Sequence, residues 1–429
     1  MRRIAHIDVN AFYCSCERLF RPDLAERPIV VLSNGDGCVV ARDAMVKRLG
    51  VPMGQPWFEM KRFAGKHGIV AFSSNYTFYG DMSRRVMDVL GRFSPDQEIY
   101  SIDESFLDLT PQPRLSGAVV GQAIRGRVRR WTGLPVCVGI GRTKTEAKLA
   151  DWIAKHDPAL GGVCDLAAMN GIERRDRETA IEVREVWGVG RRLAERLRNL
   201  GIFTVADLAA ADPRHLRAHF SVMLERTARE LRGEACLELD EVPPPRRQIV
   251  ASRTFSAPVY TPGEMAESMR TYMGRAAARM RAQGSVAGAV GVWIETNRFR
   301  THEAQHNGSA TIPLPAPSDD EAVLTAWAVE LMRRIFRPGC RYWKSGVMLL
   351  DLIPRGSEQR LLFDAPLPET EARRHRAMQT LDAVNGKWGR GTLGLGSAGL
   401  RGPRHWSMKR ELLSPRYTTS WRELPVARA

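Results

Sequence analysis

The chain has 429 residues, 44% of them hydrophobic, and a formal net charge of +16. A chain of this length and apolar content can bury several cores, which excludes a disordered tail and favours about two to four domains. The positive charge attracts polyanions, so nucleic acid or an anionic membrane surface is the favoured class of partner. No apolar run reaches the roughly 18 residues of a bilayer span, and we expect a cytoplasmic protein without membrane contact.

Short strands and helices alternate through the first part of the chain. Alternating or β-prone residues predict strands over 2–13, 26–33, 37–44, 98–109 (as a hairpin) and 135–141. Helical spacing of apolar residues predicts helices over 81–93, 118–131 and 144–156. Because regular βαβ periods are missing, the order favours an α+β sheet covered by helices.

The second part of the chain changes character three times. Residues 166–235 are helical and basic, and "EVPPPRRQ" then predicts a linker, because consecutive prolines cannot continue a helix. A second α+β unit follows, with a helix over 264–281 and an alternating strand over 286–296. From residue 355 the chain is polar, basic and glycine-rich, and we expect this tail to be partly disordered on its own.

Three carboxylates interrupt the strand patterns. Asp8 lies in the first strand, and Asp103 and Glu104 stand side by side in the centre of "EIYSIDESFLDL". Neighbours on a straight strand face opposite ways, so the chain must turn there if both acids serve one purpose. Carboxylates are hard oxygen ligands of the kind that magnesium uses beside phosphates. In a basic protein the set favours nucleotidyl transfer, whereas Asp8 taken alone also fits a solvent-facing strand end.

Two other features, "HEAQH" and the cysteines, carry little functional weight. "HEAQH" at 302–306 matches a zinc-protease motif but lies in a segment without an apolar face, so we interpret it as a loop. The seven cysteines include no C-x-x-C pair and are interpreted as reduced thiols.

"EVWGVGRRLAERLRNL" predicts a helix-hairpin-helix, in which Gly188 and Gly190 leave backbone amides open to a DNA phosphate. A plain αα-hairpin is the alternative.

"IDVNAFY", "SIDESF", "VGIGRTKTEAKLADWIAK" and the "GVG" hairpin occur in the order and spacing of Y-family translesion DNA polymerases. The chain resembles this family over nearly its whole length. The resemblance implies a multidomain α+β, right-hand fold with palm, small fingers, helical thumb and α+β little finger, in which the "SIDESF" hairpin bends at its acidic pair. The implied domains are palm 1–165 with fingers at about 20–75, thumb 166–235, linker 236–248, little finger 249–354 and tail 355–429.

The resemblance also implies roles for single residues. Asp8, Asp103 and Glu104 match the family's ligands of two Mg²⁺ ions, with the Val9 carbonyl as a backbone ligand. Tyr13 matches the steric gate that excludes ribonucleotides, although a core tyrosine is the alternative from the residue alone.

Two lysines and one peptide complete the implied set. Lys47 and Lys155 match residues that hold the nucleotide triphosphate, but Ala44 replaces a tyrosine that many relatives place on that group. "EQRLLFD" resembles the peptide by which polymerases bind the sliding clamp, and its contact residues would be Gln359, Leu362 and Phe363.

The predicted function is therefore error-prone, template-directed translesion DNA synthesis in the SOS-type response to DNA damage. The implied partners are primer-template DNA, deoxynucleoside triphosphates, the sliding clamp, a processed UmuD-like dimer and a RecA filament, in the cytoplasm at the nucleoid. Three alternatives stay open: an inactive relative that serves as a scaffold, a nucleotide cyclase on a similar palm, and a non-enzymatic DNA-binding protein.

Overall fold

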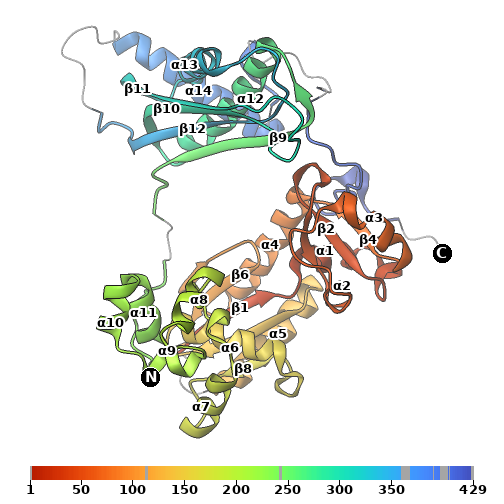
Figure 1. Cartoon of the computed structure of the whole chain (residues 1–429), viewed down its shortest axis with the longest axis vertical. Coiled ribbons are helices and arrows are strands. Elements are labelled where there is room, and N and C mark those ends of the chain that lie inside the picture. The colour runs from red at the N-terminus through yellow and green to blue at the C-terminus, as the bar shows by residue number, and fades with distance from the viewer. Residues whose placement is uncertain are drawn as a thin grey trace. The chain divides into compact units, whose positions relative to one another are not determined.

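A computed structural model describes residues 2–111, 115–240, 244–358, 368–389, 391–396, 404 and 406–426. The chain divides into two compact units, shown in Figure 1. The first unit comprises residues 1–33, 37–243 and 412–429, and the second comprises 34–36 and 244–411. Among the described helices, none combines the length and apolar character that crossing a membrane requires.

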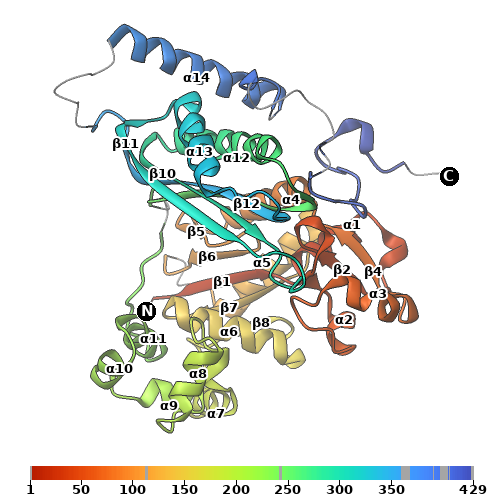
Figure 2. The same cartoon turned by 45° about the horizontal axis from the view of Figure 1, so that its top comes forward.

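A five-stranded sheet forms the centre of the first unit, in the order β5-β6-β1-β7-β8. Its strands are β1 Ile4–Val9, β5 Gln97–Ile99, β6 Glu104–Asp108, β7 Val136–Gly141 and β8 Val163–Asp165. Its main covering helices are α4 Tyr76–Leu90, α5 Gly117–Thr132 and α6 Lys144–His156. Helices α4 and α5 share a core with one face of the sheet, and α6 packs on the other (Figure 2).

Strand β1 divides its side chains between these two faces. Its odd-numbered residues from 5 to 9 enter the larger core with α4 and α5. Ile4 instead packs beside Ala147 of α6. His6 and Asp8 share the face of Ile4 because side chains alternate along a strand. The polar residues of β1 therefore point toward α6.

Glycine in β7 lets α6 approach the sheet closely. Helix α6 begins after its N-cap Thr143, whose hydroxyl accepts a hydrogen bond from the Glu146 amide. A Cβ atom at Gly139 would lie 2.0 Å from the Asp151 nitrogen and 2.2 Å from the Ala147 carbonyl oxygen. Only a residue without a side chain fits there, so Gly139 permits the close packing of α6 on the sheet.

We expect Gly139→Ala to lower the free energy of unfolding by at least about 2 kcal/mol, because the added carbon meets backbone atoms that cannot turn aside. The matched control is Gly126→Ala on α5, an exposed helical position with nothing within 4 Å of the added carbon. This control is expected to be neutral or stabilising by up to about 1 kcal/mol. Chemical denaturation measures both, and equal stability of the two variants would contradict the argument.

A second, smaller sheet follows helix α1 Phe12–Leu19 in the first unit. Its order is β3-β2-β4, with β2 Ile29–Leu32, β3 Val39–Arg42 and β4 Val70–Ser73, and it carries α2 Ala44–Arg48 and α3 Trp57–Lys66. The strand predicted over 2–13 is too long. It ends at Val9, Ala11 adopts a left-handed conformation with φ 45°, and Phe12 starts the helix. Tyr13 therefore projects from a helix.

Five helices complete the compact part of the first unit. They are α7 Gly171–Ala180, α8 Arg191–Arg198, α9 Val205–Ala210, α10 Pro213–His219 and α11 Val222–Leu231. Buried leucine and valine side chains fill their shared core. Buried Glu230 accepts hydrogen bonds from the Thr145 amide at 3.1 Å and the Thr145 hydroxyl at 2.6 Å, which ties α11 to α6.

The second unit is an antiparallel sheet covered by helices, with the strand order β11-β10-β12-β9. Its elements are β9 Ile249–Val259, α12 Pro262–Ala282, β10 Ser285–Thr296, β11 Asn307–Ser318, α13 Glu321–Ile335, β12 Tyr342–Pro354 and α14 Pro368–Trp388. Helix α12 starts at a capping box between Thr261 and Glu264, with Pro262 in its first turn. "HEAQH" lies between β10 and β11, outside any helix, as predicted.

Within the full chain, the described part of the tail packs against both units, and partial disorder of the tail on its own stays a prediction. Helix α14 is joined to α12 by the ion pair between Asp382 and Arg281 at 2.6 Å, and Trp406 enters the core of the second unit. From Leu412 onward the chain belongs to the first unit again. Short 3-10 turns lie at Pro22–Leu24, Asn34–Asp36, Pro158–Leu160, Val183–Glu185 and Trp421–Glu423.

Candidate active site

The three predicted carboxylates lie together at one end of the five-stranded sheet. Asp8 and Glu104 are directly opposed on the antiparallel strands β1 and β6. The Val9 amide donates a hydrogen bond of 2.9 Å to the Asp103 carbonyl, which fixes Asp103 beside the end of β1. The chain bends between β5 and β6, and the Ser101 hydroxyl closes this bend by donating to Asp103 at 2.6 Å. The two adjacent acids of "SIDESF" therefore stand at a turn.

Asp8 is paired with a lysine from α6. Lys155 Nζ lies 2.8 Å from Asp8 Oδ1 and 2.6 Å from Asp151 Oδ2. Burial raises the pKa of Asp8 to about 7, with Lys155 opposing the shift and the charges of Asp151 and Glu104 adding to it. Although burial lowers the pKa of Lys155, the two aspartates raise it above its usual value. The structure thus brings the predicted Lys155 to the predicted Asp8.

Glu104 is paired with a second lysine of α6, which the sequence analysis missed. Lys148 Nζ lies 3.0 Å from Glu104 Oε2 and over the rings of Tyr100 and Trp187. Asp151 was missed as well. Lys148, Asp151 and Lys155 are spaced by three and four residues, which places them on one face of α6. This helical spacing, in a chain whose predicted strands carry acidic residues, was the sequence signal that could have indicated Lys148 and Asp151 as site residues.

His6 lies beneath this cluster and was also missed. Its Nδ1 is 3.5 Å from Asp151 Oδ2, and its Nε2 is 3.8 Å from Glu104 Oε1. Burial lowers the pKa of His6, against the opposing effect of Asp151, which favours the neutral ring. His6 therefore places a polar ring between Asp151 and Glu104 without adding positive charge.

The donor set fits a divalent cation in its chemistry, although its side chains do not converge. Among the described residues, no three histidine, cysteine, aspartate or glutamate side chains are grouped closely enough to hold a metal ion. The carboxylates of Asp8 and Glu104 turn instead to Lys155 and Lys148. The two carboxylates are oxygen donors at opposed strand positions, and the ammonium group of a lysine neutralises each of them in this structure. A hard cation would supply the same compensation once the lysines turn away.

Tyr13 stands near the carboxylates in a group of tyrosines. Its ring is stacked on Tyr79 at a centroid distance of 4.5 Å and meets Tyr76 edge-on at 6.3 Å. Burial raises its pKa, and the charges of Tyr76 and Asp103 add to the shift. The ring is therefore held on one face and lies within electrostatic range of Asp103.

The remaining predicted residues lie on other elements. Lys47 is exposed on α2, beside the three-stranded sheet. Gly188 has φ +86° and Gly190 is the N-cap of α8, and both have open space where a side chain would stand. The clamp-peptide residues Gln359, Leu362 and Phe363 lie outside the described residues.

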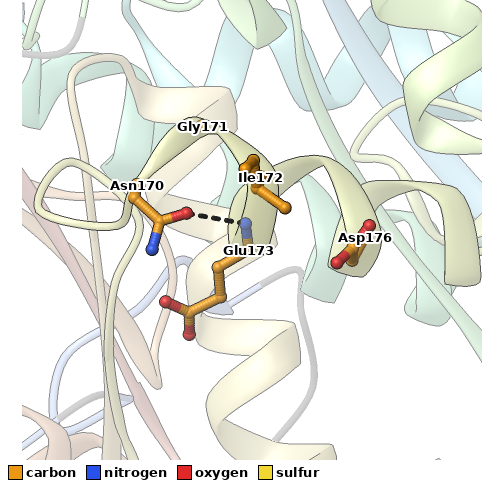
Figure 3. A pocket seen from close by; sticks show the side chains of 5 residues that line it. All are labelled: Asn170, Gly171, Ile172, Glu173 and Asp176. Atoms are coloured by element: carbon orange, nitrogen blue, oxygen red, sulfur yellow. Dashed lines mark hydrogen bonds between the residues drawn. The ribbon is translucent and has the colours of Figure 1, made fainter.

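A shallow pocket elsewhere in the first unit carries none of this chemistry. It lies at the start of α7 and is lined by Asn170, Gly171, Ile172, Glu173 and Asp176 (Figure 3). Asn170 caps the helix by accepting a hydrogen bond from the Glu173 amide at 2.9 Å. Its polar groups therefore serve the helix end, and none of the predicted site residues lines it.

The fold is that of Y-family DNA polymerases. A Y-family DNA polymerase chimera superposes with a TM-score of 0.66 at 20% identity, over 82% of this chain and 100% of that chain. An insertion ternary complex of Dbh DNA polymerase superposes with a TM-score of 0.53, also at 20% identity and with the same coverage. The predicted right-hand architecture is confirmed at the level of the fold.

The sequence comparisons identify the family. The impB/mucB/samB family matches residues 7–151, its C-terminal domain matches 246–362, and a domain of unknown function matches 375–427. Protein ImpB of Salmonella typhimurium is 43% identical over 98% of both chains. Protein UmuC of Salmonella typhimurium is 44% identical over 97% of this chain and 98% of that one. The chain belongs to the impB/mucB/samB family.

This relation confirms the function class that the sequence predicted. The chain is a Y-family DNA polymerase of the error-prone, translesion type that acts in SOS mutagenesis. A more distant relative, DNA polymerase IV of Corynebacterium diphtheriae, is 29% identical over 77% of this chain and 71% of its own length. The family relation therefore excludes two of the alternatives, a nucleotide cyclase and a non-enzymatic DNA-binding protein.

Proposed function

We propose that Asp8, Asp103 and Glu104 form the catalytic centre of two-magnesium nucleotidyl transfer, with the Val9 carbonyl as a fourth oxygen. The observation that carries this proposal is the pairing of Asp8 opposite Glu104, with Asp103 held to Val9 by a backbone hydrogen bond. Y-family polymerases generally use a divalent metal. The ions would neutralise charge on the attacking and leaving oxygens of phosphoryl transfer.

The residues around the carboxylates prepare them for this role. Lys155 neutralises Asp8 before substrate arrives, and it can then turn to the triphosphate of the incoming nucleotide. Asp151, which contacts Lys155 at 2.6 Å, holds the lysine at the site during this exchange. Lys148 likewise neutralises Glu104 before substrate arrives. Lys47 on α2 would bind the triphosphate from the fingers.

The other predicted contacts belong to the substrate and to DNA. Tyr13 would meet the sugar of the incoming deoxynucleotide and exclude a ribose by collision with its 2′-hydroxyl. The open amides around Gly188 and Gly190 would bind a backbone phosphate of primer-template DNA. Catalysis by this chain would then consist mainly of positioning and of charge compensation.

We propose the following domain boundaries. The palm covers residues 1–165 with fingers at about 20–75, the thumb 166–235, a linker 236–248, the little finger 249–354 and the tail 355–429. The five-stranded sheet, the three-stranded sheet and the four-stranded sheet lie in the palm, the fingers and the little finger, respectively. Helices α7 to α11 supply the thumb.

The partners beyond DNA and deoxynucleotides follow from the family relation. We propose that Gln359, Leu362 and Phe363 dock on the sliding clamp, and that a processed UmuD-like dimer and a RecA filament support synthesis. The place of action would be the cytoplasm, at the nucleoid. The inactive-scaffold alternative is disfavoured because all three carboxylates are present in the matching positions.

Primer extension past an abasic site tests this function. The full-length protein with magnesium, four deoxynucleotides, the UmuD-like partner and a RecA filament is expected to extend a primer beyond the lesion. Removal of the metal with a chelator is expected to abolish extension, because the ions, and not the carboxylates, would neutralise the reacting phosphate. An undamaged template controls for loading on DNA. Absence of extension on both templates would contradict the proposal.

A further inference from the structure

The chain returns to the first unit at Leu412 and packs at the junction of β4 and α4. The Ser73 amide donates a hydrogen bond of 2.9 Å to the Leu412 carbonyl, and Leu413 forms a parallel bridge with Ser73 at the end of β4. The Asn75 side-chain amide donates to the Ser414 carbonyl at 3.1 Å, and its oxygen caps α4. Residues 412–418, which we name the C-terminal clasp, thus bind where β4 passes into α4.

Glu17 links the clasp to two helices. Its side chain is 0% exposed, and its Oε1 accepts hydrogen bonds from Tyr79 at 2.6 Å and from Ser414 at 2.9 Å. Burial raises the pKa of Glu17 to about 7, and the two donors oppose that shift. A buried acid at the junction of α1, α4 and the clasp is costly unless it is hydrogen-bonded, so the three segments are coupled through this group.

Tyr13 is linked by packing to the same junction of α1, α4 and the clasp. It stands four residues before Glu17 on α1, so both side chains lie on one face of that helix. Tyr79 contacts both of them, because its ring is stacked on Tyr13 with an interplanar angle of 17° while its hydroxyl donates to Glu17. The position of the Tyr13 ring therefore depends on Tyr79, and Tyr79 on Glu17.

Tyr417 holds the other side of the junction. Its ring is only 6% exposed, and it stacks on Phe20 at 4.7 Å with an interplanar angle of 9°. It also meets Phe78 edge-on at 5.6 Å, and Phe78 precedes Tyr79 on α4. Tyr417 is therefore wedged between the end of α1 and the start of α4, and it belongs to the core of the first unit.

We propose that the C-terminal clasp is a determinant of sugar selection, in which Ser414 and Tyr417 are positioning residues for the ring of Tyr13. This inference rests on the proposed function, because it needs Tyr13 to be the steric gate. Steric exclusion of a single hydroxyl depends on fractions of an ångström, so a ring that can tilt excludes a ribose poorly. The clasp holds α1 and α4 at one spacing and thereby limits that tilt.

Single-nucleotide insertion kinetics on the full-length protein test the clasp. The measured quantity is the ratio of kcat/KM for a deoxynucleotide to kcat/KM for the matching ribonucleotide. We expect Tyr417→Ala to lower this ratio about tenfold, mainly through better use of the ribonucleotide. Ser414→Ala is expected to lower it by a smaller factor, because Glu17 keeps the hydrogen bond from Tyr79.

Two variants separate positioning from general damage. Tyr417→Phe keeps the stacked ring and is expected to restore the ratio of the unaltered protein. Thr419→Ala changes an exposed position two residues further along and is expected to leave the ratio unchanged. A purely structural role of the clasp would reduce the use of both nucleotides equally and leave their ratio intact, which would overturn the proposal.

Tyr13→Ala distinguishes failure of the clasp from failure of the gate. If Tyr13→Ala lowers the ratio and Tyr417→Ala does not, the gate stands and the clasp proposal is wrong. If Tyr13→Ala leaves the ratio unchanged, Tyr13 is not the gate, and both proposals are wrong.

Discussion

Asp8→Asn is expected to reduce primer extension at least about a thousandfold while leaving the fold intact, because it removes one of the three carboxylates that would hold the metal ions, and those ions would neutralise the reacting phosphate. Asparagine has nearly the same shape as aspartate, so the packing of β1 against α6 is retained. Burial already raises the pKa of Asp8 to about 7, which means that ionising Asp8 costs more in the folded protein than in the unfolded chain. A neutral side chain at this position is therefore compatible with folding.

The contribution of Asp8 to stability depends on pH. A carboxyl group whose pKa is raised on folding makes the protein less stable as the pH rises toward that value. At pH 8, where Asp8 is mostly ionised, Asp8→Asn should not lower the melting temperature. Loss of extension without loss of stability would assign the defect to the chemistry.

A matched control lies on the neighbouring strand. Asp108 is an acid of β6 opposite Ile4, four pairs along the ladder from Glu104, and its carboxylate accepts a hydrogen bond from the Thr110 amide at 2.7 Å. Asp108→Asn should retain most of the activity, because Asp108 takes no part in the proposed centre. Equal activity of Asp8→Asn and the unaltered protein in a primer-extension time course would remove Asp8 from the mechanism.

The strands that carry the proposed catalytic acids could be predicted because their signals are local. β-prone runs on either side of "DE" indicate a hairpin, and two adjacent acids with one purpose require a turn. The structure has that turn, closed by Ser101. By contrast, Lys148 and Asp151 share the helical spacing of ordinary surface residues, and only the approach of α6 over Gly139 brings them to the acids. That approach is tertiary and leaves no local pattern.

The surroundings of Tyr13 show the same limit. The alternation of apolar and polar residues continues past Val9 in the sequence and predicts a strand there. In the structure the strand ends, and Ala11 is the N-cap of helix α1. The clasp is harder still to predict, because Glu17 and Ser414 are separated by 397 positions. Nothing in the composition of a basic, glycine-rich tail indicates that part of it fills the core of the first unit. Contacts at such separation come from the fold alone.

Tyr13→Ala is expected to lower the preference for deoxynucleotides about a hundredfold, through improved insertion of ribonucleotides, because it removes the ring that would collide with a 2′-hydroxyl. The ring is placed for this by its stacking on Tyr79 and by its proximity to Asp103, one of the proposed catalytic acids. Steady-state insertion of each nucleotide opposite an undamaged template base gives the preference directly.

The control for this variant is Tyr13→Phe, which keeps the ring and its stacking on Tyr79. It should retain the preference, because the collision involves the ring and not the phenolic hydroxyl. If Tyr13→Phe loses the preference as fully as Tyr13→Ala, selection would depend on a hydrogen bond from the hydroxyl. If neither variant changes it, the sugar must be sensed by a side chain other than Tyr13, and the tyrosine cluster would serve only to pack α1 against α4.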